Sequence, residues 1–327
     1  MNIYKRGNIR IIIILFMLFA LFAYIISSKI INIANLPECT SDKQKYYKQL
    51  HPVGFPMLGN TCYANSSLQA LLSLNSFVFY FESVGNRKLY NLIKLLIKEV
   101  ENNTIPDKKN LKYLITRIKN SDDTFFVIGN QECASEFIQL LLNQVDQEIN
   151  NEDGSIMDNF RFDTVTEFKC MECKTGWKGP SETVFPIYIN KNISISEAIK
   201  SSMIEKIDDF KCEFCKKKVN IQAKRSFTSN ANILMVVNKC YDYITKEKLH
   251  YTFNVNYNLL INNFNYVLSA IIIHIGSTIN SGHYIALCKR NNSWYKINDT
   301  IWEKIPKKIL LENIKQMEGY VFFYEKD

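Results

Sequence analysis

Two pairs of cysteines with the same short spacing place the strongest constraint on how this chain can fold. They are the motifs CMEC, with Cys170 and Cys173, and CEFC, with Cys212 and Cys215. A Cys-x-x-Cys turn presents two thiolates to one ion, and two such turns together complete a tetrahedral site suited to zinc. Because protein sulfurs would fill all four positions, the predicted role of the zinc ion is structural. Four unrelated core cysteines are the alternative, and the repeated spacing argues against it.

Lysines beside both cysteine pairs allow a second interpretation of the metal site. Lys169, Lys174, Lys211 and residues 216–218 flank the cysteines. They could balance the surplus negative charge of the thiolates, but such residues also flank the metal in nucleic-acid-binding zinc ribbons. The formal net charge of the chain is only +8, and its basic residues are scattered. Scattered charge is typical of solvated surfaces, so we predict no nucleic-acid partner.

The chain divides into a helical half and a strand-rich half, which indicates an α+β fold. Its 327 residues are 47% hydrophobic and 13% aromatic, which is enough for a packed globular body. Residues 58 to about 150 repeat apolar side chains at three- and four-residue spacing, as helices do. From residue 160 onward, short alternating or β-branched runs predict strands. One helix interrupts them at SISEAIKSSMI, where Ser194 and Glu197 form a capping signature.

An uncharged run near the N-terminus predicts a membrane anchor. Residues 11–28, IIIILFMLFALFAYIISS, lie between Arg10 and Lys29. This length is at the lower limit for a spanning helix and long for the core of a signal peptide. We predict a short N-terminal segment at residues 1–10, a retained transmembrane anchor at 11–28 and a linker at 29–51; a cleaved signal peptide is the alternative. Basic residues lie on both sides of the run, so charge does not set its orientation.

A further cysteine, Cys62, lies in the stretch LGNTCYANSSLQALL at residues 58–72. It stands between a short polar loop and a segment with helical periodicity. At a helix N-terminus, the backbone N–H groups and the macrodipole favour an anion, and a thiolate is stabilised there. Cys62 is therefore a candidate nucleophile. The alternative is a buried structural cysteine.

A histidine with a nearby polar pair supplies the partners that such a nucleophile needs. His283 follows Ser-Gly in INSGHYIALCKRNNSWYKINDT, and Asn298 and Asp299 end the aromatic-rich run SWYKI that comes after it. A hairpin of this length would place the pair beside the imidazole, where either side chain could accept its N–H and select its tautomer. A cysteine at a helix start with a histidine and an Asn or Asp from a distant sheet is the arrangement of papain-like thiol proteases.

The motifs resemble the ubiquitin-specific protease family of deubiquitinating enzymes. GNTCYANSSLQALL resembles the Cys box of that family, and HIGSTINSGHYIALCKRNNSWYKINDT resembles its His box. GNQECASEF lies where the family has a Gln-Gln-Asp-x-x-Glu-Phe segment, the cysteine pairs lie where it has zinc-binding fingers, and GYVFFYEK resembles its closing strand. The similarity runs in order from about residue 52 to the C-terminus.

The resemblance implies a fold and a domain arrangement. The fold is the papain-like cysteine protease fold, with a helical thumb, a β-rich palm and zinc-binding fingers that together grip ubiquitin. The catalytic domain would span residues 52–327, with the fingers at about 165–230, and one transmembrane helix would precede it.

The resemblance also implies roles for individual residues. By motif position, Cys62 is the nucleophile, His283 the general base and Asn298 the third member, with Asp299 as a support. The substrate-binding positions are Gln131, Gly282 and Tyr284, of which the last two would line the channel for the Gly-Gly tail of ubiquitin. The thiolate would attack the carbonyl of the last glycine of ubiquitin, and water would then release the thioester.

Two positions depart from the family pattern. Met57 stands where the family usually has an asparagine that helps to hold the oxyanion, and methionine has no hydrogen-bond donor. Losing one such donor can cost about a hundredfold in rate. Cys133 replaces the usual aspartate, a residue type that would pair with the basic tail of ubiquitin. The loss of that aspartate predicts weaker recognition of the tail or a different ubiquitin-like substrate. Met57 favours, as an alternative to an active deubiquitinase, a catalytically weak or inactive ubiquitin-binding module held at a membrane.

The expected location is a membrane, with a single span and the catalytic domain in the cytosol. Ubiquitin is cytosolic and nuclear, and thiolates survive where thiols stay reduced. Glycosylation sequons begin at Asn65 and Asn298, inside the predicted active site, where a glycan would block access. Family members of similar layout favour the mitochondrial outer membrane, with the endoplasmic reticulum as second choice.

Overall fold

The computed structural model describes residues 49–327 apart from residues 84–87, 120–121, 149–153, 191, 243–244, 246, 279–280 and 315–316. Residues 48–327 form one compact unit. The anchor predicted at residues 11–28 lies outside the described residues, as do residues 1–10 and most of the linker. Within the described ranges, no helix is both long and apolar enough to cross a bilayer.

Helices occupy the first half of this unit, as the apolar spacing predicts. In α4, Leu89, Ile93, Ile97 and Val100 are buried along one face, so the helix packs through a single apolar stripe. In α2, by contrast, every residue is buried. The helices are α2 (Cys62–Leu71), α3 (Asn75–Ser83), α4 (Lys88–Glu101), α5 (Lys108–Ile115) and α6 (Ala134–Glu148).

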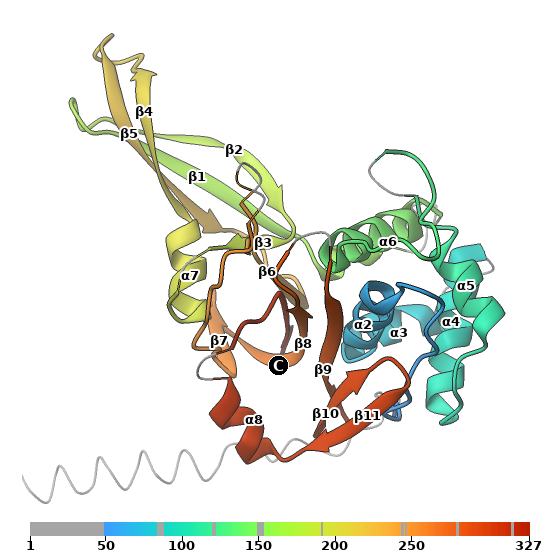
Figure 1. The fold of residues 1–327 in the computed structure, drawn as a ribbon. Helices are drawn as coiled ribbons and strands as arrows, with labels where there is room; N and C mark the ends of the chain where they lie inside the picture. Colours follow the sequence, from blue (N-terminus) through green and yellow to red (C-terminus); the bar gives the residue numbers. More distant parts are fainter. Residues whose placement is uncertain are drawn as a thin grey trace, which may run out of the picture. The chain divides into compact units, whose positions relative to one another are not determined.

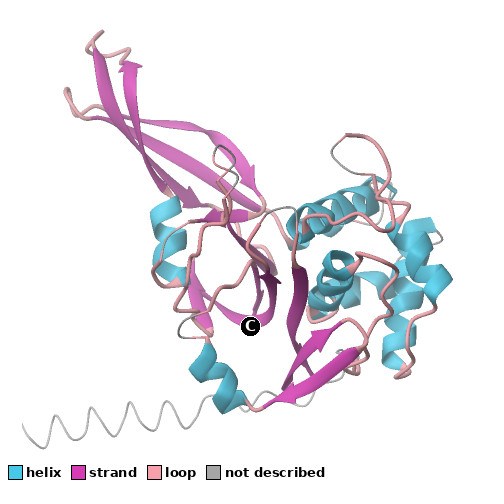
Figure 2. Cartoon of the chain, in the orientation of Figure 1, coloured by secondary structure: helices cyan, strands magenta, loops and turns pink. Residues whose placement is uncertain are grey.

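A large, mainly antiparallel sheet dominates the second half of the unit (Figures 1 and 2). Its described strands run in the order β11-β10-β9-β8-β12-β6-β3, and β7 also pairs with β8. Only the pairing of β3 with β6 in this sheet is parallel among the described strands. The strands are β3 (Ile187–Ile189), β6 (Ile233–Asn238), β7 (Asn258–Ile261), β8 (Phe264–Ile275), β9 (His283–Arg290), β10 (Ser293–Asn298), β11 (Ile301–Ile305) and β12 (Val321–Lys326).

Both faces of the large sheet are covered at its centre. Along β12, Val321 and Phe323 enter the apolar core that includes the helices, whereas Phe322 and Tyr324 enter a second core on the opposite face. Successive side chains of a strand point to opposite faces. The run YVFFYE can therefore be apolar at consecutive positions, because each face has its own core.

A smaller sheet, here called the finger sheet, projects from the large one (Figure 1). Its described strands run in the order β2-β1-β5-β4 and are all antiparallel. Most of their residues are exposed or half-buried, so side-chain burial contributes little to its stability. The strands are β1 (Phe162–Cys170), β2 (Gly176–Val184), β4 (Ile204–Lys211) and β5 (Lys218–Phe227).

Short helical segments adjoin the strands of the second half. Helix α7 (Ile195–Ser202) begins with the predicted capping box, in which Ser194 and Glu197 bond each other's backbone N–H groups. A 3₁₀ turn, η2 (Ile156–Asn159), precedes β1, and α8 (Lys307–Asn313) follows β11.

The packing of α2 against β9 sets the frame of the candidate site. Arg290, at the end of β9, is 2% exposed, and its Nη2 donates to the carbonyl oxygen of Gln69 at 2.7 Å near the end of α2. A buried guanidinium thus satisfies a carbonyl at the helix C-terminus, where positive charge is favoured. Cys62 and His283 are the first residues of α2 and β9, so the two chemically active side chains belong to the opposite end of the same contact.

Candidate active site

Cys62 begins α2, as the sequence predicts, and its thiol lies in a buried position. The preceding loop is closed by the N–H of Leu58, which donates to Oγ1 of Thr61 at 3.1 Å. Cys62 is only 4% exposed. Burial raises the pKa of its thiol, and backbone N–H groups of Tyr284 and Tyr63 lower it by a smaller amount. Burial therefore outweighs the stabilisation expected from the helix N-terminus, and the thiol needs a neighbouring base to become a thiolate.

His283 and Asn298 supply that base and its orienting partner. Nε2 of His283 lies 2.6 Å from Oδ1 of Asn298. The predicted hairpin is present, since β9 and β10 pair with Ala286 opposite Ile297. Because an amide oxygen only accepts, Nε2 carries the proton, which leaves Nδ1 as the nitrogen able to accept one. Cys62 is close to this ring, because α2 packs against β9 and the backbone N–H of Tyr284, the residue after His283, lowers the pKa of the Cys62 thiol.

Asp299 lies beside the His283–Asn298 pair. Its Oδ2 is 3.7 Å from Nε2 of His283, and its Oδ1 accepts a hydrogen bond of 2.7 Å from Nδ2 of Asn65. Burial raises the pKa of the Asp299 carboxyl, whereas the Asn65 bond and the charge of His283 lower it. The sequence marks Asn65 as the start of a glycosylation sequon next to Cys62, but it predicts no contact between Asn65 and Asp299. A polar amide one turn after Cys62 was the available signal, but it did not reveal the partner.

The positions expected to bind substrate lie next to the histidine. The side-chain amide of Gln131 makes two hydrogen bonds to Gly282: it donates to the carbonyl oxygen and accepts from the N–H, both at 3.1 Å. A Cβ on Gly282 would lie 2.2 Å from Nε2 of His274, so no other residue fits there. Tyr284 is 8% exposed, and its ring packs 4.6 Å from that of His274. The structure thus brings all three positions together, with the Tyr284 ring largely buried.

The two departures from the family pattern occupy different surroundings. Met57 is 40% exposed, and its sulfur lies 3.9 Å from Oγ1 of Thr61, so it adds no donor beside Cys62. Cys133 is half-buried, and its sulfur lies 2.8 Å from the hydroxyl of Tyr320 and 3.2 Å from that of Ser135. A thiol in this cluster of hydroxyls exchanges hydrogen bonds with uncharged neighbours.

The four predicted metal ligands meet at the far end of the finger sheet. All four sulfur atoms lie within 4.8 Å of one another, and those of Cys173 and Cys212 are 3.9 Å apart. Tetrahedral zinc with Zn–S bonds near 2.3 Å separates its sulfurs by about 3.8 Å, so the cluster fits that ion. The four cysteines, Cys170, Cys173, Cys212 and Cys215, would hold a structural zinc ion with no open position.

The two cysteine turns have the same backbone pattern. The N–H of Lys174 donates to the carbonyl of Cys170, and that of Lys216 donates to the carbonyl of Cys212. Both lysines adopt positive φ, 62° and 59°. Matching left-handed turns explain why the same spacing recurs: each turn folds back to present its two sulfurs to one point.

Comparison with known proteins gives one consistent result. The profile of the family "Ubiquitin carboxyl-terminal hydrolase" matches residues 53–324. The Salmo salar protein "Ubiquitin carboxyl-terminal hydrolase 12" is 26% identical, with 84% of this chain and 90% of that protein covered. The Homo sapiens protein "Ubiquitin carboxyl-terminal hydrolase 42" is 24% identical over 85% of this chain, and this chain spans 23% of its length.

Solved structures show the same fold. A SAGA deubiquitinase module of Ubp8, Sgf11, Sus1 and Sgf73 bound to monoubiquitin matches with a TM-score of 0.71 and 20% identity, covering 86% of this chain and 70% of that chain. The same module bound to ubiquitin aldehyde matches with a TM-score of 0.70 and 19% identity. Since the family profile spans nearly the whole described unit, the chain belongs to the ubiquitin carboxyl-terminal hydrolase family, the cysteine-dependent hydrolases of ubiquitin.

Proposed function

We propose that this chain is a membrane-anchored deubiquitinating thiol protease that cleaves the bond after the C-terminal glycine of ubiquitin. The observation that carries the proposal is the position of Cys62 beside the strand that bears His283, whose Nε2 is held by Asn298 at 2.6 Å. A buried cysteine with a purely structural role would need no oriented imidazole. Similar solved structures with monoubiquitin and ubiquitin aldehyde support ubiquitin as the substrate.

The proposed reaction has two stages. Nδ1 of His283 takes the proton of the Cys62 thiol, and the thiolate attacks the carbonyl carbon of the last glycine. The leaving amine takes the proton from the imidazolium as its bond to the carbonyl breaks, which leaves a thioester on Cys62. Water then attacks the thioester and gives one proton to His283, the carbon–sulfur bond breaks, and the imidazolium returns that proton to the departing sulfur. The products are the free carboxylate of ubiquitin and the restored thiol.

A ubiquitin probe with a C-terminal electrophile tests this proposal. We expect covalent capture of the full-length protein, loss of capture in Cys62→Ala, and release of ubiquitin from an isopeptide-linked substrate by the wild type. Absence of both capture and hydrolysis in a folded protein that still binds ubiquitin would instead establish the second candidate, a weak or inactive ubiquitin-binding module. Met57, which offers no donor for the oxyanion, is the observation that favours this candidate.

The membrane part of the proposal rests on the uncharged run at residues 11–28. We place the catalytic domain in the cytosol, because reduced thiols suit both Cys62 and the four zinc-binding cysteines. The mitochondrial outer membrane is the proposed location, ahead of the endoplasmic reticulum. Protease treatment of isolated organelles tests the orientation: a C-terminal tag should be digested without detergent, and a protected tag would place the domain inside.

A further inference from the structure

The side chain of Asn65 connects the nucleophile helix to the acid beside the histidine. Asn65 is 2% exposed and lies one turn after Cys62 in α2, where its backbone N–H bonds the carbonyl oxygen of Thr61 at 2.9 Å. Its Nδ2 donates to Oδ1 of Asp299 at 2.7 Å and to the carbonyl oxygen of Pro56 at 3.4 Å. Both amide hydrogens therefore have acceptors.

The other end of the same amide has no partner. Oδ1 of Asn65 is buried and makes no hydrogen bond within the described residues. Leaving a buried acceptor unpaired costs about 1–3 kcal/mol. The opposite orientation would direct the amide oxygen at the carboxylate of Asp299 and at the carbonyl of Pro56, which is repulsive twice over. The observed orientation is the one that serves Asp299.

Asp299 is also held by its backbone. It adopts φ of 49°, an uncommon conformation for a residue with a side chain. Its carbonyl oxygen accepts the N–H of Phe55 at 2.7 Å. Gly54 allows this close approach, because a Cβ there would lie 2.3 Å from the carbonyl oxygen of Thr300. The backbone therefore fixes where Asp299 stands, and Asn65 fixes where its carboxylate points, with Oδ2 3.7 Å from His283.

We propose that Asn65 is a positioning residue that keeps the Asp299 carboxylate charged and directed at the imidazole of His283. Asn65 does not contact the reacting atoms and acts through Asp299. The inference rests on the proposed function, since the role matters only where His283 serves Cys62. It also explains why a polar side chain is retained in the buried interior of α2.

The electrostatic consequence follows from the groups around Asp299. Desolvation by burial raises the pKa of its carboxyl, and Asn65 and His283 oppose that change. The thiol of Cys62 also senses Asp299, whose charge raises the pKa of that thiol. Without Asn65, the carboxyl keeps its desolvation but loses a hydrogen bond to its charged form. The Asp299 carboxyl then stays protonated up to a higher pH. Over that added pH range, the imidazolium of His283 has no charged carboxylate from Asp299 beside it.

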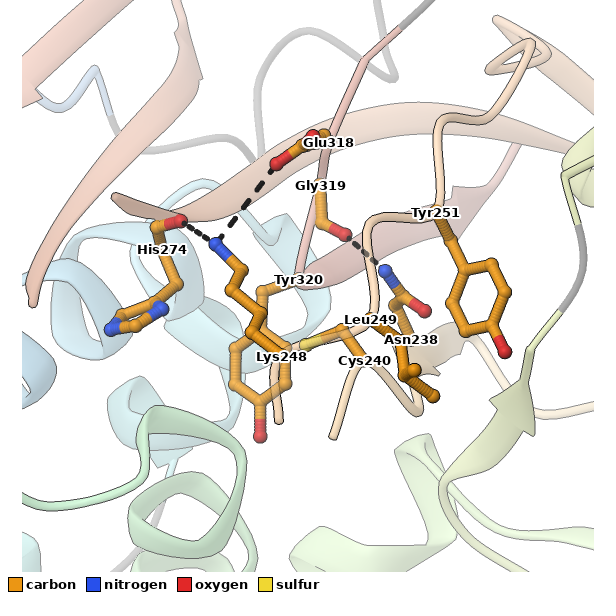
Figure 3. Close-up of a pocket in the computed structure, with 9 residues that line it drawn as sticks. All are labelled: Asn238, Cys240, Lys248, Leu249, Tyr251, His274, Glu318, Gly319 and Tyr320. Carbon is orange, nitrogen blue, oxygen red and sulfur yellow. Dashed lines mark hydrogen bonds and ion pairs between the residues drawn. The ribbon is translucent and has the colours of Figure 1, made fainter. Parts of the chain in front are cut away.

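The test compares two buried asparagines in the full-length protein. Asn238 is 3% exposed and donates from Nδ2 to the carbonyl oxygen of Gly319 at 3.1 Å (Figure 3). Its Oδ1, like that of Asn65, has no hydrogen-bond partner in the part of the chain that the structure describes. We expect Asn65→Ala to lower kcat on a ubiquitin substrate roughly 10- to 100-fold, the cost of a hydrogen bond to a charged group, with KM within about twofold. We also expect the acidic limb of the pH–rate profile to move to higher pH. Asn238→Ala should leave that limb in place.

A double-mutant cycle decides whether Asn65 acts through Asp299. In the background of Asp299→Asn, the substitution Asn65→Ala should cost no more than about twofold, because its target is already uncharged. Asn65→Asp preserves the shape of the side chain and should move the acidic limb further than Asn65→Ala does. This second variant keeps the test decisive if the alanine variant folds poorly. The proposal would be overturned if the losses in kcat from Asn65→Ala and Asp299→Asn were additive in the double variant. It would also be overturned if the acidic limb of the pH–rate profile stayed at its wild-type position in Asn65→Ala.

Alkylation of Cys62 by iodoacetamide separates this inference from the proposed function. The rate reports the thiolate and needs no ubiquitin. We expect its pH midpoint to shift in Asn65→Ala, because the thiol and the imidazolium both sense the charge of Asp299, and to stay unchanged in Asn238→Ala. If the wild type cleaves no ubiquitin substrate but this difference is present, the proposed function fails and the inference stands. If the wild type is active and the midpoints of both variants equal that of the wild type, the inference fails alone.

Discussion

The zinc site and the candidate active site both join residues that are far apart in the chain, but different forces hold them. Around the zinc ligands, the finger sheet has few buried side chains, and two left-handed turns present the sulfurs. Around Cys62, every residue of α2 is buried and the helix packs on β9, β8 and α6. Metal coordination must therefore supply the stability of the first site, whereas apolar packing supplies that of the second. Loss of the metal site should therefore leave the packing around Cys62 intact, and loss of catalytic residues should leave the finger sheet folded.

The largest expected effect is in the active site. Cys62→Ala and His283→Ala should each lower kcat/KM for a ubiquitin substrate by at least about a thousandfold, because nucleophile and base act as one unit. Steady-state kinetics provides the measurement, and thermal unfolding is the control. Because the packing of α2 survives both changes, we expect the unfolding temperature to stay close to that of the wild type. Residual activity near the wild-type value in either variant would remove that residue from the mechanism.

The second expected effect is in the finger sheet. Metal analysis should find about one zinc per chain. Cys170→Ser together with Cys212→Ser should abolish metal binding and destabilise the sheet, since structural zinc binding contributes on the order of 10 kcal/mol. Alkylation of Cys62 should proceed at the wild-type rate in this variant while ubiquitin binding weakens. A metal-free protein that is folded and binds ubiquitin with the wild-type affinity would contradict the structural zinc site. Slower alkylation of Cys62 in the serine variant would contradict the independence of the two regions.

A smaller effect is expected at the residues that orient His283. Asn298→Ala should lower kcat roughly 10- to 100-fold rather than abolish activity. The reason is that Oδ2 of Asp299 lies 3.7 Å from Nε2 of His283 and can accept a hydrogen bond from that nitrogen in place of Asn298. Asp299→Ala alone should also reduce kcat, and the double variant should be close to inactive. If Asn298→Ala were as inactive as Cys62→Ala while Asp299→Ala had no effect, the two residues would not share this role.

The smallest expected effect is a gain. Met57→Asn would restore the amide that the family usually has five residues before the nucleophile, and we expect kcat to rise about tenfold with KM nearly constant. The side chain is 40% exposed, so the change should cost little stability. Met57→Leu, which adds no donor, is the matched control. A rate that is unchanged or lower in Met57→Asn would mean that other groups already stabilise the oxyanion.

Local patterns predicted much of the fold. The apolar spacing between residues 58 and 150 gave helices, the runs after residue 160 gave strands, and the capping signature at Ser194 is a formed capping box. The hairpin that joins His283 to Asn298 was predictable for the same reason, since its strands are neighbours in sequence. Each of these features depends on side chains within a few residues of one another or across one short turn.

Contacts between distant segments could not be predicted in this way. From the sequence, Arg290 is one of the scattered basic residues expected on a solvated surface. In the structure it is 2% exposed and donates a hydrogen bond to the carbonyl oxygen of Gln69 near the end of α2. Cys133 reads as a lost acid, yet its sulfur lies 2.8 Å from the hydroxyl of Tyr320. In both cases the surroundings come from elements far away in the chain, and no periodicity encodes which elements will pack there.

The sequence by itself determined which residues could do chemistry: a cysteine at a helix start, a histidine with an Asn-Asp pair across a hairpin, and two turns with spacing for zinc. Only the tertiary structure decided how those residues are tuned. Burial raises the pKa of Cys62, so the thiol depends on His283, and the carboxylate of Asp299 is held by Asn65 from another segment. The physical reason is that desolvation and hydrogen-bond partners are properties of a packed environment, and that environment exists only when distant segments meet.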